Sequence, residues 1–467
     1  MNFNKETKIL LLSLAITLGL VGGGIYYLFK DILPGGNQVS VNISNSANNN
    51  QSESRISAGE ISLTPGDVSV AKRDGIAAFK SGKYEEAVNY FQAALQSKKN
   101  DPETLIYLNN AKIGNKKSYS IAVSIPLATE PNFALEVLRG VAQAQNEINL
   151  QGGIKNTPLK VVIASDDDRV ELVKDIAQNF VKNSEILGVV GHFASDATLA
   201  AGEIYNSQQL VAISPTSSAV KISNFSPYVF RTVPSDFMAA RALANYMTTK
   251  LNKKKAAIFY NSQSGYSQSL KSEFVSAVSL AGGEVSHEFD MSKPDFSAAQ
   301  SIAQAQGVEV LMLAANSQLL DKGLQVIQVN QRRLPLLAGD GFYALKTLEI
   351  SQGQGENMVL AVPWHLESNP GADFPQKSRQ LWDADVNWRT ALSYDAARAL
   401  ITAIETNPSR QGVQQALKSG NFAARGASGE LRFANSGDRN APVQLVQVKS
   451  QPNSRSRTGY DFELVRN

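Results

Sequence analysis

The feature that most constrains the fold is a regular alternation of short apolar runs with longer amphipathic stretches, beginning at Tyr119. The runs Leu159–Ser165 and Ile186–Val190 are rich in β-branched residues and do not alternate with polar ones, as in parallel strands covered on both faces. Val170–Lys182 lies between them and has the apolar spacing of a helix. Because repeated strand, helix, strand units form parallel sheets with right-handed crossovers, the sequence predicts an α/β protein.

The same alternation starts again after Pro234, which predicts a second sheet. Its expected elements are a helix at 235–250, a strand at 256–261, a helix at 265–281, a strand at 285–291, a helix at 296–305 and strands at 308–316 and 334–339. A strand at 358–363 and a long helical region at 377–405 are expected to lead back to the first sheet. We therefore predict two doubly wound parallel sheets joined by a hinge. Lobe 1 covers about 118–234 and 363–435, and lobe 2 covers about 235–362 and 436–467.

The stretch 186–218 contains two predicted strands that each end in small hydroxyl residues. The first strand leads to Ser195 and the second to Ser217 and Ser218. Ligands of open α/β sheets bind outside the carboxyl ends of the strands, and a helix N-terminus there favours an anion. Asp340 follows a strand of the second lobe, so its carboxylate is expected to face these hydroxyls across a cleft.

Several motifs extend this pattern over the chain from about residue 119 to its end. They include GHFASDAT at 191–198, ISPTSS at 213–218, YVFRTVPSD at 228–236, SYDAARALITAI at 393–404 and LRFANSGDR at 431–439. In order and spacing they resemble the type I periplasmic binding proteins, in particular the leucine/isoleucine/valine-type substrate-binding proteins of ABC transporters. The resemblance implies a two-lobed fold that closes on an amino-acid-like ligand.

The resemblance also implies roles for individual residues. Ser195, Ser217 and Ser218 stand where the family holds the ligand's α-carboxylate, and Asp340 stands where it binds the α-ammonium. Tyr266 and Asn316 complete the expected ligand-binding set. Asp340 replaces a glutamate of the branched-chain binders, and Asn316 lies where an aromatic is frequent. These two departures leave branched-chain specificity open.

Residues 9–29 carry no charge and are long enough to cross a bilayer as a helix. The run ends without an A-x-A-like cleavage site, so an uncleaved transmembrane anchor is favoured over a cleaved signal peptide. Lys5 and Lys8 precede the run, which places the N-terminus in the cytoplasm and the rest of the chain outside it. Residues 30–67 are rich in Asn, Ser and Gly and predict a flexible linker.

A small helical module is expected at 68–117. Its glycines, alanines and aromatics, followed by Asp101-Pro102, resemble one tetratricopeptide repeat and the first helix of another. Such repeats usually stack in sets to bury a core. A lone repeat is therefore expected to pack on the main domain, on a partner protein or on a second copy. A protein-docking role and a spacer role are both open.

Composition and motifs argue against other classes of function. A net charge of +3 from 45 basic and 42 acidic residues gives no electrostatic case for nucleic acid. Cysteine is absent, which excludes disulfides and thiolate metal sites. His192, His287 and His365 are far apart in the sequence, and Asp166-Asp167-Asp168 is more typical of a helix cap than of a metal site. We find no nucleophile elbow, dinucleotide fingerprint or phosphate loop. The sequence thus predicts no enzyme, no cofactor and no metal.

The prediction from the sequence is an extracytoplasmic solute-binding protein, anchored in the membrane, that delivers an amino acid or similar small zwitterion to an ABC permease. Two alternatives stay open. Activators of peptidoglycan synthases also join tetratricopeptide-like helices to this fold, so the chain could instead be an interaction protein that binds through its helical repeat. It could also be a ligand sensor that reports to a signalling partner.

Overall fold

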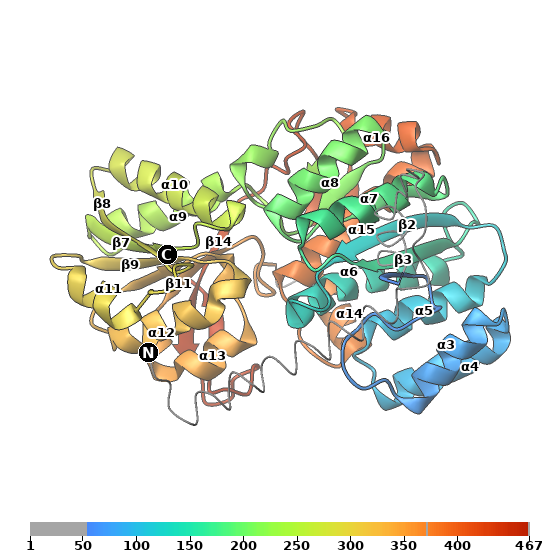
Figure 1. The fold of residues 1–467 in the computed structure, drawn as a ribbon, viewed down its shortest axis with the longest axis horizontal. Helices are drawn as coiled ribbons and strands as arrows, with labels where there is room; N and C mark the ends of the chain where they lie inside the picture. The colour runs from blue at the N-terminus through green and yellow to red at the C-terminus, as the bar shows by residue number, and fades with distance from the viewer. Residues whose placement is uncertain (1–53, 370–371, 466–467) are drawn as a thin grey trace, which may run out of the picture. The chain divides into compact units, whose positions relative to one another are not determined.

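The computed structural model describes residues 54–369 and 372–465, and Figure 1 shows the arrangement of their helices and strands. The predicted anchor at 9–29 and the first part of the predicted linker lie outside these residues. Within the described ranges, no helix combines the length and the apolar character that crossing a bilayer requires. The anchor therefore stays a prediction from the sequence.

The first sheet has six strands in the order β1-β3-β2-β4-β5-β6. Their bounds are β1 (Ile56–Ser57), β2 (Tyr119–Ile125), β3 (Leu159–Ser165), β4 (Ile186–Val190), β5 (Ala212–Ser214) and β6 (Val229–Arg231). Strands β2 to β6 are parallel, as the alternating pattern predicts, whereas β1 pairs with β3 in the antiparallel direction. The bounds of β3 and β4 are those expected from the sequence.

Helices cover both faces of this sheet (Figure 1). On one face α6 (Pro131–Leu150) and α15 (Trp388–Thr406) share a core with β2 and β3, and on the other α7 (Val170–Lys182) and α8 (Ser195–Ser207) pack on β2, β4 and β5. Two further helices, α14 (Asp373–Trp382) and α16 (Arg410–Lys418), belong to the same lobe. The predicted helical region 377–405 is thus two helices, because Asp383 takes a left-handed conformation (φ 54°) and ends α14.

Gly140 allows α6 and α15 to cross in close contact. A Cβ atom at this position would collide with the carbonyl oxygen of Thr390 and the amide nitrogen of Tyr394 on α15. Both obstacles are backbone atoms of a buried helix, so the two helices would have to move apart to accept a side chain. The approach of α15 to the first sheet therefore depends on a glycine.

The second sheet has seven strands in the order β15-β14-β11-β10-β9-β7-β8. Their bounds are β7 (Lys255–Tyr260), β8 (Glu284–Asp290), β9 (Val310–Ala314), β10 (Leu336–Ala338), β11 (Val359–Val362), β14 (Gln444–Ser450) and β15 (Tyr460–Leu464). The prediction of a wholly parallel sheet is wrong here, because β14 runs antiparallel to β11 and β15 antiparallel to β14. The two C-terminal strands form a hairpin that extends one edge of the sheet.

Two helices cover one face of the second sheet, α9 (Asp236–Asn245) and α10 (Gly265–Leu280). The opposite face carries α11 (Ala298–Gln304), α12 (Leu320–Asn330) and α13 (Leu345–Ser351). Helix α12 was not expected from the sequence, although Leu320, Leu324 and Ile327 have helical spacing and are buried. Lobe 2, like lobe 1, is therefore a sheet covered by helices on both faces.

The chain passes between the two lobes after β6, after β11 and before β14. The third passage lies later than predicted. The backbone N of Arg231 in β6 donates to the carbonyl oxygen of Gly437 over 3.0 Å, and Asn224 N donates to Ser436 O over 2.9 Å. The start of lobe 2 at 436 is therefore too early, since residues up to 438 still pair with the first sheet. A short hairpin, β12 (Ala424–Gly426) and β13 (Gly429–Leu431), precedes this passage.

The helical module consists of α3 (Val70–Lys80), α4 (Tyr84–Ser97) and α5 (Pro102–Ile113), at the predicted places. Helix α5 is almost wholly buried. The side chain of Asn110 joins it to β3, because Nδ2 donates to Val161 O (2.7 Å) and Oδ1 accepts from Val161 N (3.2 Å). The module is thus packed on lobe 1, one of the three placements that the sequence left open.

The end of the predicted linker is folded, so the assignment 30–67 is wrong for residues 54–67. Strand β1 lies at an edge of the first sheet, and the Ser57 hydroxyl accepts from the backbone N of Gly59 (3.0 Å) and Glu60 (3.1 Å). Phe79 of α3 covers Gly59 closely. Backbone pairing to a sheet edge needs few large apolar side chains, which is why composition alone suggested a free tether.

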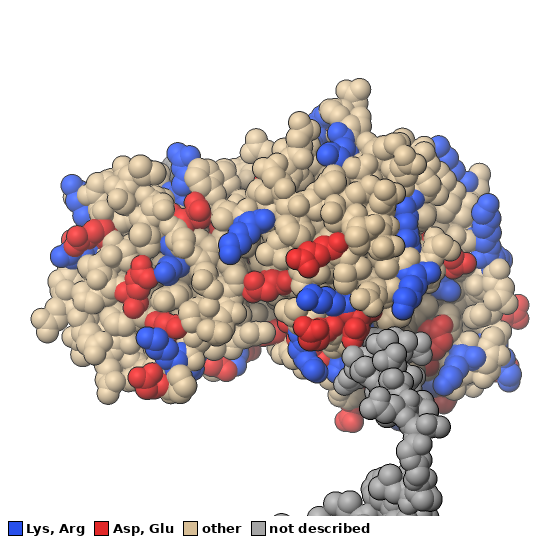
Figure 2. All heavy atoms as spheres, turned by 45° about the horizontal axis from the view of Figure 1, so that its top comes forward, with Lys and Arg blue, Asp and Glu red and all other residues tan. Residues whose placement is uncertain are grey.

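The face shown in Figure 2 carries lysines and arginines interspersed with aspartates and glutamates. No continuous patch of one sign is visible on it. This distribution agrees with the nearly balanced composition and gives no support for nucleic-acid binding through this face.

Candidate ligand-binding site

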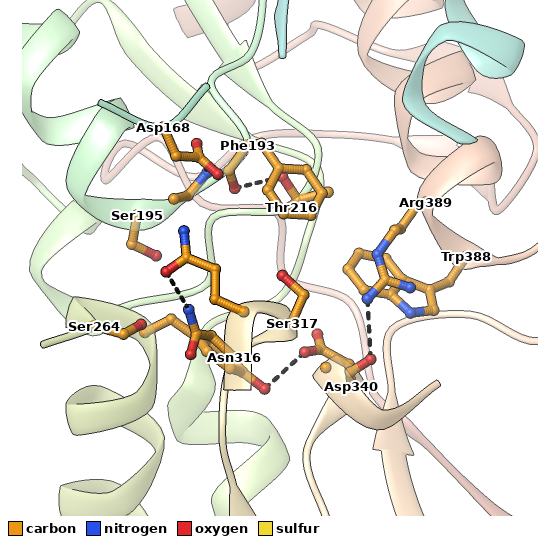
Figure 3. A pocket seen from close by; sticks show the side chains of 14 residues that line it. Asp168, Phe193, Ser195, Thr216, Ser264, Asn316, Ser317, Asp340, Trp388 and Arg389 are labelled. Atoms are coloured by element: carbon orange, nitrogen blue, oxygen red, sulfur yellow. Dashed lines mark hydrogen bonds between the residues drawn. The ribbon is translucent and has the colours of Figure 1, made fainter. Parts of the chain in front are cut away.

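A pocket lies at the carboxyl ends of the parallel strands of the two sheets, with about 510 Å³ of empty space, part of it open to solvent. Most of its residues lie in the segments that follow strands, with Asp168 after β3, Ser195 after β4, Thr216 after β5, Asn316 after β9 and Asp340 after β10. Figure 3 shows these side chains converging from both lobes. The position is the one that open α/β sheets use for small ligands.

On the lobe 1 side, Ser195 is the first residue of α8 and is 2 % exposed. Its Oγ accepts from Ala219 N over 3.3 Å, which leaves its own hydrogen to donate to a ligand. The N-cap residue Ala194 has no side chain that could satisfy the first amides of the helix. The N-terminus of α8 therefore presents donors and a partial positive charge to the pocket.

The structure does not bring Ser217 and Ser218 to this pocket; Thr216 lines it instead. The Ser217 hydroxyl is turned into lobe 1, where Oγ lies 2.8 Å from Thr198 Oγ1 and 3.1 Å from Phe193 O. Ser218 lines a smaller cavity beneath the pocket, together with Asp236, Tyr266 and Asp340. The direction of each hydroxyl in this turn is set by backbone contacts that the sequence does not reveal.

On the lobe 2 side, Asp340 and Tyr266 form a hydrogen-bonded pair. The Tyr266 hydroxyl donates to Asp340 Oδ1 over 2.8 Å. Burial raises the pKa of Tyr266 well above its ordinary value, and the neighbouring Asp340 raises it further, so the phenol stays a donor. Burial also raises the pKa of Asp340, and Arg389 opposes this shift. A buried carboxylate with one phenol partner is suited to accept from a cation.

Asn316 extends the polar wall of lobe 2, as predicted. Its Oδ1 accepts from Asn261 Nδ2 over 2.9 Å, and its Nδ2 donates to Gln318 Oε1 over 3.4 Å. Ser317 and Gln318 also line the pocket. Four of the six predicted site residues, Ser195, Tyr266, Asn316 and Asp340, are therefore brought together.

Asp168, Thr216, Trp388 and Arg389 are among the pocket residues that sequence reasoning missed. Arg389 is 2 % exposed, and its Cζ lies 4.4 Å from the centroid of the Phe133 ring. Its Nη1 donates to Tyr343 O (3.0 Å) and its Nη2 to Asp340 O (3.2 Å), both in lobe 2. The sequence signal that could have predicted this part of the pocket is the Trp388-Arg389 pair at the start of α15, a helix rich in small apolar residues.

The three aspartates after β3 have separate structural partners. Asp166 Oδ2 accepts from Ser124 Oγ (2.8 Å) and lies 2.6 Å from His192 Nδ1. Asp167 forms an ion pair with Arg55, next to β1. Asp168 Oδ1 accepts from Ala194 N over 3.1 Å. No cluster of acidic or histidine side chains that could hold a metal is found among the described residues.

His192 and its acid do not form a catalytic arrangement with Ser195. The Nε2 atom of His192 lies 2.9 Å from the hydroxyl of Tyr205, and His192, Asp166 and Tyr205 are all fully buried. The histidine is therefore engaged at both nitrogens inside lobe 1. Its role is to hold the loop that precedes α8.

Asp236 is a second buried acid beneath the pocket. It opens α9, and its backbone N donates to Ser218 O over 2.8 Å. Its Oδ2 and the Ser218 Oγ find no hydrogen-bond partner of normal geometry among the described residues. Burial raises the pKa of Asp236 to about 7. The carboxyl is therefore largely protonated in the folded protein below neutral pH.

This pKa predicts a pH dependence of stability. Between about pH 4 and pH 7 the unfolded chain loses the Asp236 proton while the folded chain keeps it, so the free energy of unfolding falls as pH rises through this window. Asp236→Asn has no proton to lose. We expect the stability of the variant relative to the parent to increase from pH 4 to pH 7 and to level off above it, measured by urea unfolding at four pH values. A constant difference between the two proteins would contradict this assignment.

Comparison with known proteins identifies the family. A family model described as periplasmic binding protein matches residues 119–454. The chain belongs to this family. The match covers both lobes and begins after α5, so this periplasmic binding protein carries its helical module in front of the family domain.

Two relatives from Pseudomonas aeruginosa are named for amino acids. An amino acid binding protein is 28 % identical over 183 residues, which is 38 % of this chain and 49 % of the relative. A leucine-, isoleucine-, valine-, threonine- and alanine-binding protein is 26 % identical over 316 residues, covering 64 % of this chain and 81 % of the relative. The chain thus spans about half of the first relative and most of the second. By their names both are binding proteins.

A solved structure supports the fold of this periplasmic binding protein independently. The leucine-binding protein of Thermotoga maritima superposes with a TM-score of 0.65 at 23 % identity, over 75 % of this chain and 99 % of the other. The similarity at this identity concerns the arrangement of the two lobes. The ligand has to be argued from the pocket itself.

Proposed function

We propose that this periplasmic binding protein captures an amino acid, or a similar small zwitterion, between its two lobes and delivers it to an ABC permease outside the cytoplasm. The observation that carries the proposal is the polarity of the pocket. Hydroxyl and helix N-terminal donors lie on lobe 1, and the buried Asp340 carboxylate lies on lobe 2. The names of the two Pseudomonas relatives support an amino acid as the ligand.

In this proposal the ligand's α-carboxylate accepts from the Ser195 hydroxyl and from the N-terminus of α8. The Thr216 hydroxyl already donates to Phe193 O over 2.7 Å, so it shapes the pocket wall and has no hydrogen left for the carboxylate. Burial raises the pKa of Asp168 well above its ordinary value, with a further rise from Asp166. A raised pKa reduces the negative charge on Asp168 and so its repulsion of a carboxylate bound beside it.

The ligand's α-ammonium donates to Asp340, which also accepts from the Tyr266 phenol. Because each end of the zwitterion contacts a different lobe, binding favours the closed arrangement. The lobes also meet directly, since Gly265 N donates to Asp196 Oδ2 over 2.8 Å and Val220 N to Ser269 Oγ over 3.0 Å. A bound ligand adds to these contacts across the pocket.

The helical module supports a second role beside solute capture. Helices α3 and α4 expose most of their outer residues while α5 is buried on lobe 1, so they offer a surface to a partner protein. This surface would suit the peptidoglycan synthase or the signalling protein of the alternatives left open by the sequence. Location outside the cytoplasm is part of the same proposal and rests on the family and on the predicted anchor.

A thermal-shift screen of the full chain against the twenty amino acids tests the proposal. A ligand present at 100 times its Kd should stabilise the folded protein by about 2.7 kcal/mol. Matched controls are the amine and the acid that each retain only one charged end of the best ligand, and neither should stabilise the protein comparably. Absence of a shift with every amino acid would reject solute capture in favour of the interaction role.

A further inference from the structure

Two neighbouring side chains of the pocket have donors without acceptors. Trp388 and Arg389 are each 2 % exposed and open helix α15. Neither the Nε1–H of Trp388 nor the Nε–H of Arg389 finds a hydrogen-bond acceptor among the described residues. Both residues line the pocket, and in Figure 3 they lie together on the side away from Ser195 and Asp168. Both nitrogen atoms are buried as well as unpaired, whereas buried donors are normally paired.

The corner is also held rigidly. The Arg389 guanidinium packs against two rings, with its Cζ 4.2 Å from the Trp388 ring and 4.4 Å from the Phe133 ring. Its two Nη atoms are fixed by the carbonyl oxygens of Tyr343 and Asp340. A cation held in this way is pre-organised, because little side-chain freedom is lost when a ligand binds.

The charge of Arg389 is not neutralised by a direct partner. No ion pair joins Arg389 to any residue of the described ranges, and the nearest opposing charges act on it only through space, Asp340 most strongly. The first turn of α15 contains no acidic residue, and its N-cap Asn387 accepts from Arg389 N over 2.9 Å. The positive end of a long helix therefore adds to the cation.

We propose that Trp388 and Arg389 bind a carboxylate in the side chain of the ligand, so that the preferred solute is an acidic amino acid. The inference rests on the proposed function, which assigns the α-carboxylate to Ser195 and the α-ammonium to Asp340. A branched aliphatic side chain would leave both buried donors unpaired and would also desolvate Asn316 and Gln318. The Asp340 carboxylate then pairs with the ammonium of the ligand, and the Arg389 cation pairs with the second carboxylate of the same molecule.

The test is calorimetric titration of the full chain with aspartate, glutamate, asparagine, glutamine and leucine. We expect one of the acidic amino acids to bind at least 10-fold more tightly than its amide and than leucine. Trp388→Phe keeps the ring and removes only the Nε1–H, and should weaken the acidic ligand about 10-fold with little effect on the amide. Arg389→Met should abolish the preference for acid over amide. Arg432→Met removes an exposed arginine and should preserve it.

The possible failures can be distinguished. If leucine or an amide binds as tightly as the acids, or if Trp388→Phe leaves the acid preference intact, the side-chain assignment is overturned while solute capture stands. If none of the five ligands binds and the wider amino acid screen also fails, the proposed function and this inference fall together. The Trp388→Phe result decides the matter should Arg389→Met fail to fold.

Discussion

Replacing Asp340 by asparagine should weaken binding of the preferred amino acid by about 2 to 5 kcal/mol, the usual cost of removing one partner of a buried charge pair. The side chain keeps its size and can still accept from Tyr266, whose hydroxyl lies 2.8 Å from Oδ1 in the parent. Only the charge that faces the ammonium is lost. Calorimetric titration with the ligand found by the screen measures the difference.

Two variants calibrate this result. Ser195→Ala removes one hydroxyl donor to the α-carboxylate and should cost nearer 1.5 to 3 kcal/mol, as for a hydrogen bond to a charged group. Asp295→Asn removes an exposed carboxylate of the same lobe and should leave affinity unchanged. Should Asp340→Asn bind like the parent, the ammonium is not bound at Asp340 and the polarity of the pocket has been misread.

The largest loss of stability is expected for Arg439→Met. The Nη1 atom of Arg439 lies 3.1 Å from Asp395 Oδ2, and the side chains are 7 % and 0 % exposed. Asp395 belongs to α15, and Arg439 lies in the third passage between the lobes, so the pair fastens that passage to lobe 1. Removing the arginine leaves a buried carboxylate without its cation, which typically costs about 3 to 5 kcal/mol of unfolding free energy.

Urea unfolding at pH 7 tests this expectation against two controls. Arg432→Met breaks an exposed pair with Glu430, whose side chains are 56 % and 62 % exposed, and should cost less than about 1 kcal/mol. The double variant Asp395→Asn, Arg439→Met removes the stranded charge and should recover part of the loss. If Arg439→Met and Arg432→Met lower the free energy of unfolding equally, burial of the Arg439–Asp395 pair adds nothing to stability.

Elements with a strong local pattern were predictable from the sequence. The strands β3 and β4 and helix α7 have the bounds that their apolar spacing predicts. Pairings between distant segments were not predictable. Strand β1 has only two residues, and β14 and β15 join the second sheet in the antiparallel direction after the chain has visited lobe 1. A local pattern does not encode which sheet edge a returning segment meets.

The same limit applies to the site. Ser195, Asn316 and Asp340 follow strands of the alternating pattern and Tyr266 lies next to one, so the sheet topology brings them together. Trp388 and Arg389 reach the pocket from α15, far along the chain, and long-range packing such as that of α15 on α6 places them there. Ser217 is the residue that the family resemblance implies, whereas Thr216 lines the pocket, because the sequence does not show which hydroxyl of this turn faces the ligand.

A crystal structure of the full chain with the amino acid selected by the screen tests the central claim most directly. The account predicts one ligand in the pocket between the lobes, its α-carboxylate within hydrogen-bond distance of Ser195 Oγ and its α-ammonium within hydrogen-bond distance of Asp340. A ligand bound outside this pocket, or with its carboxylate at Asp340 and its ammonium at Ser195, would contradict it.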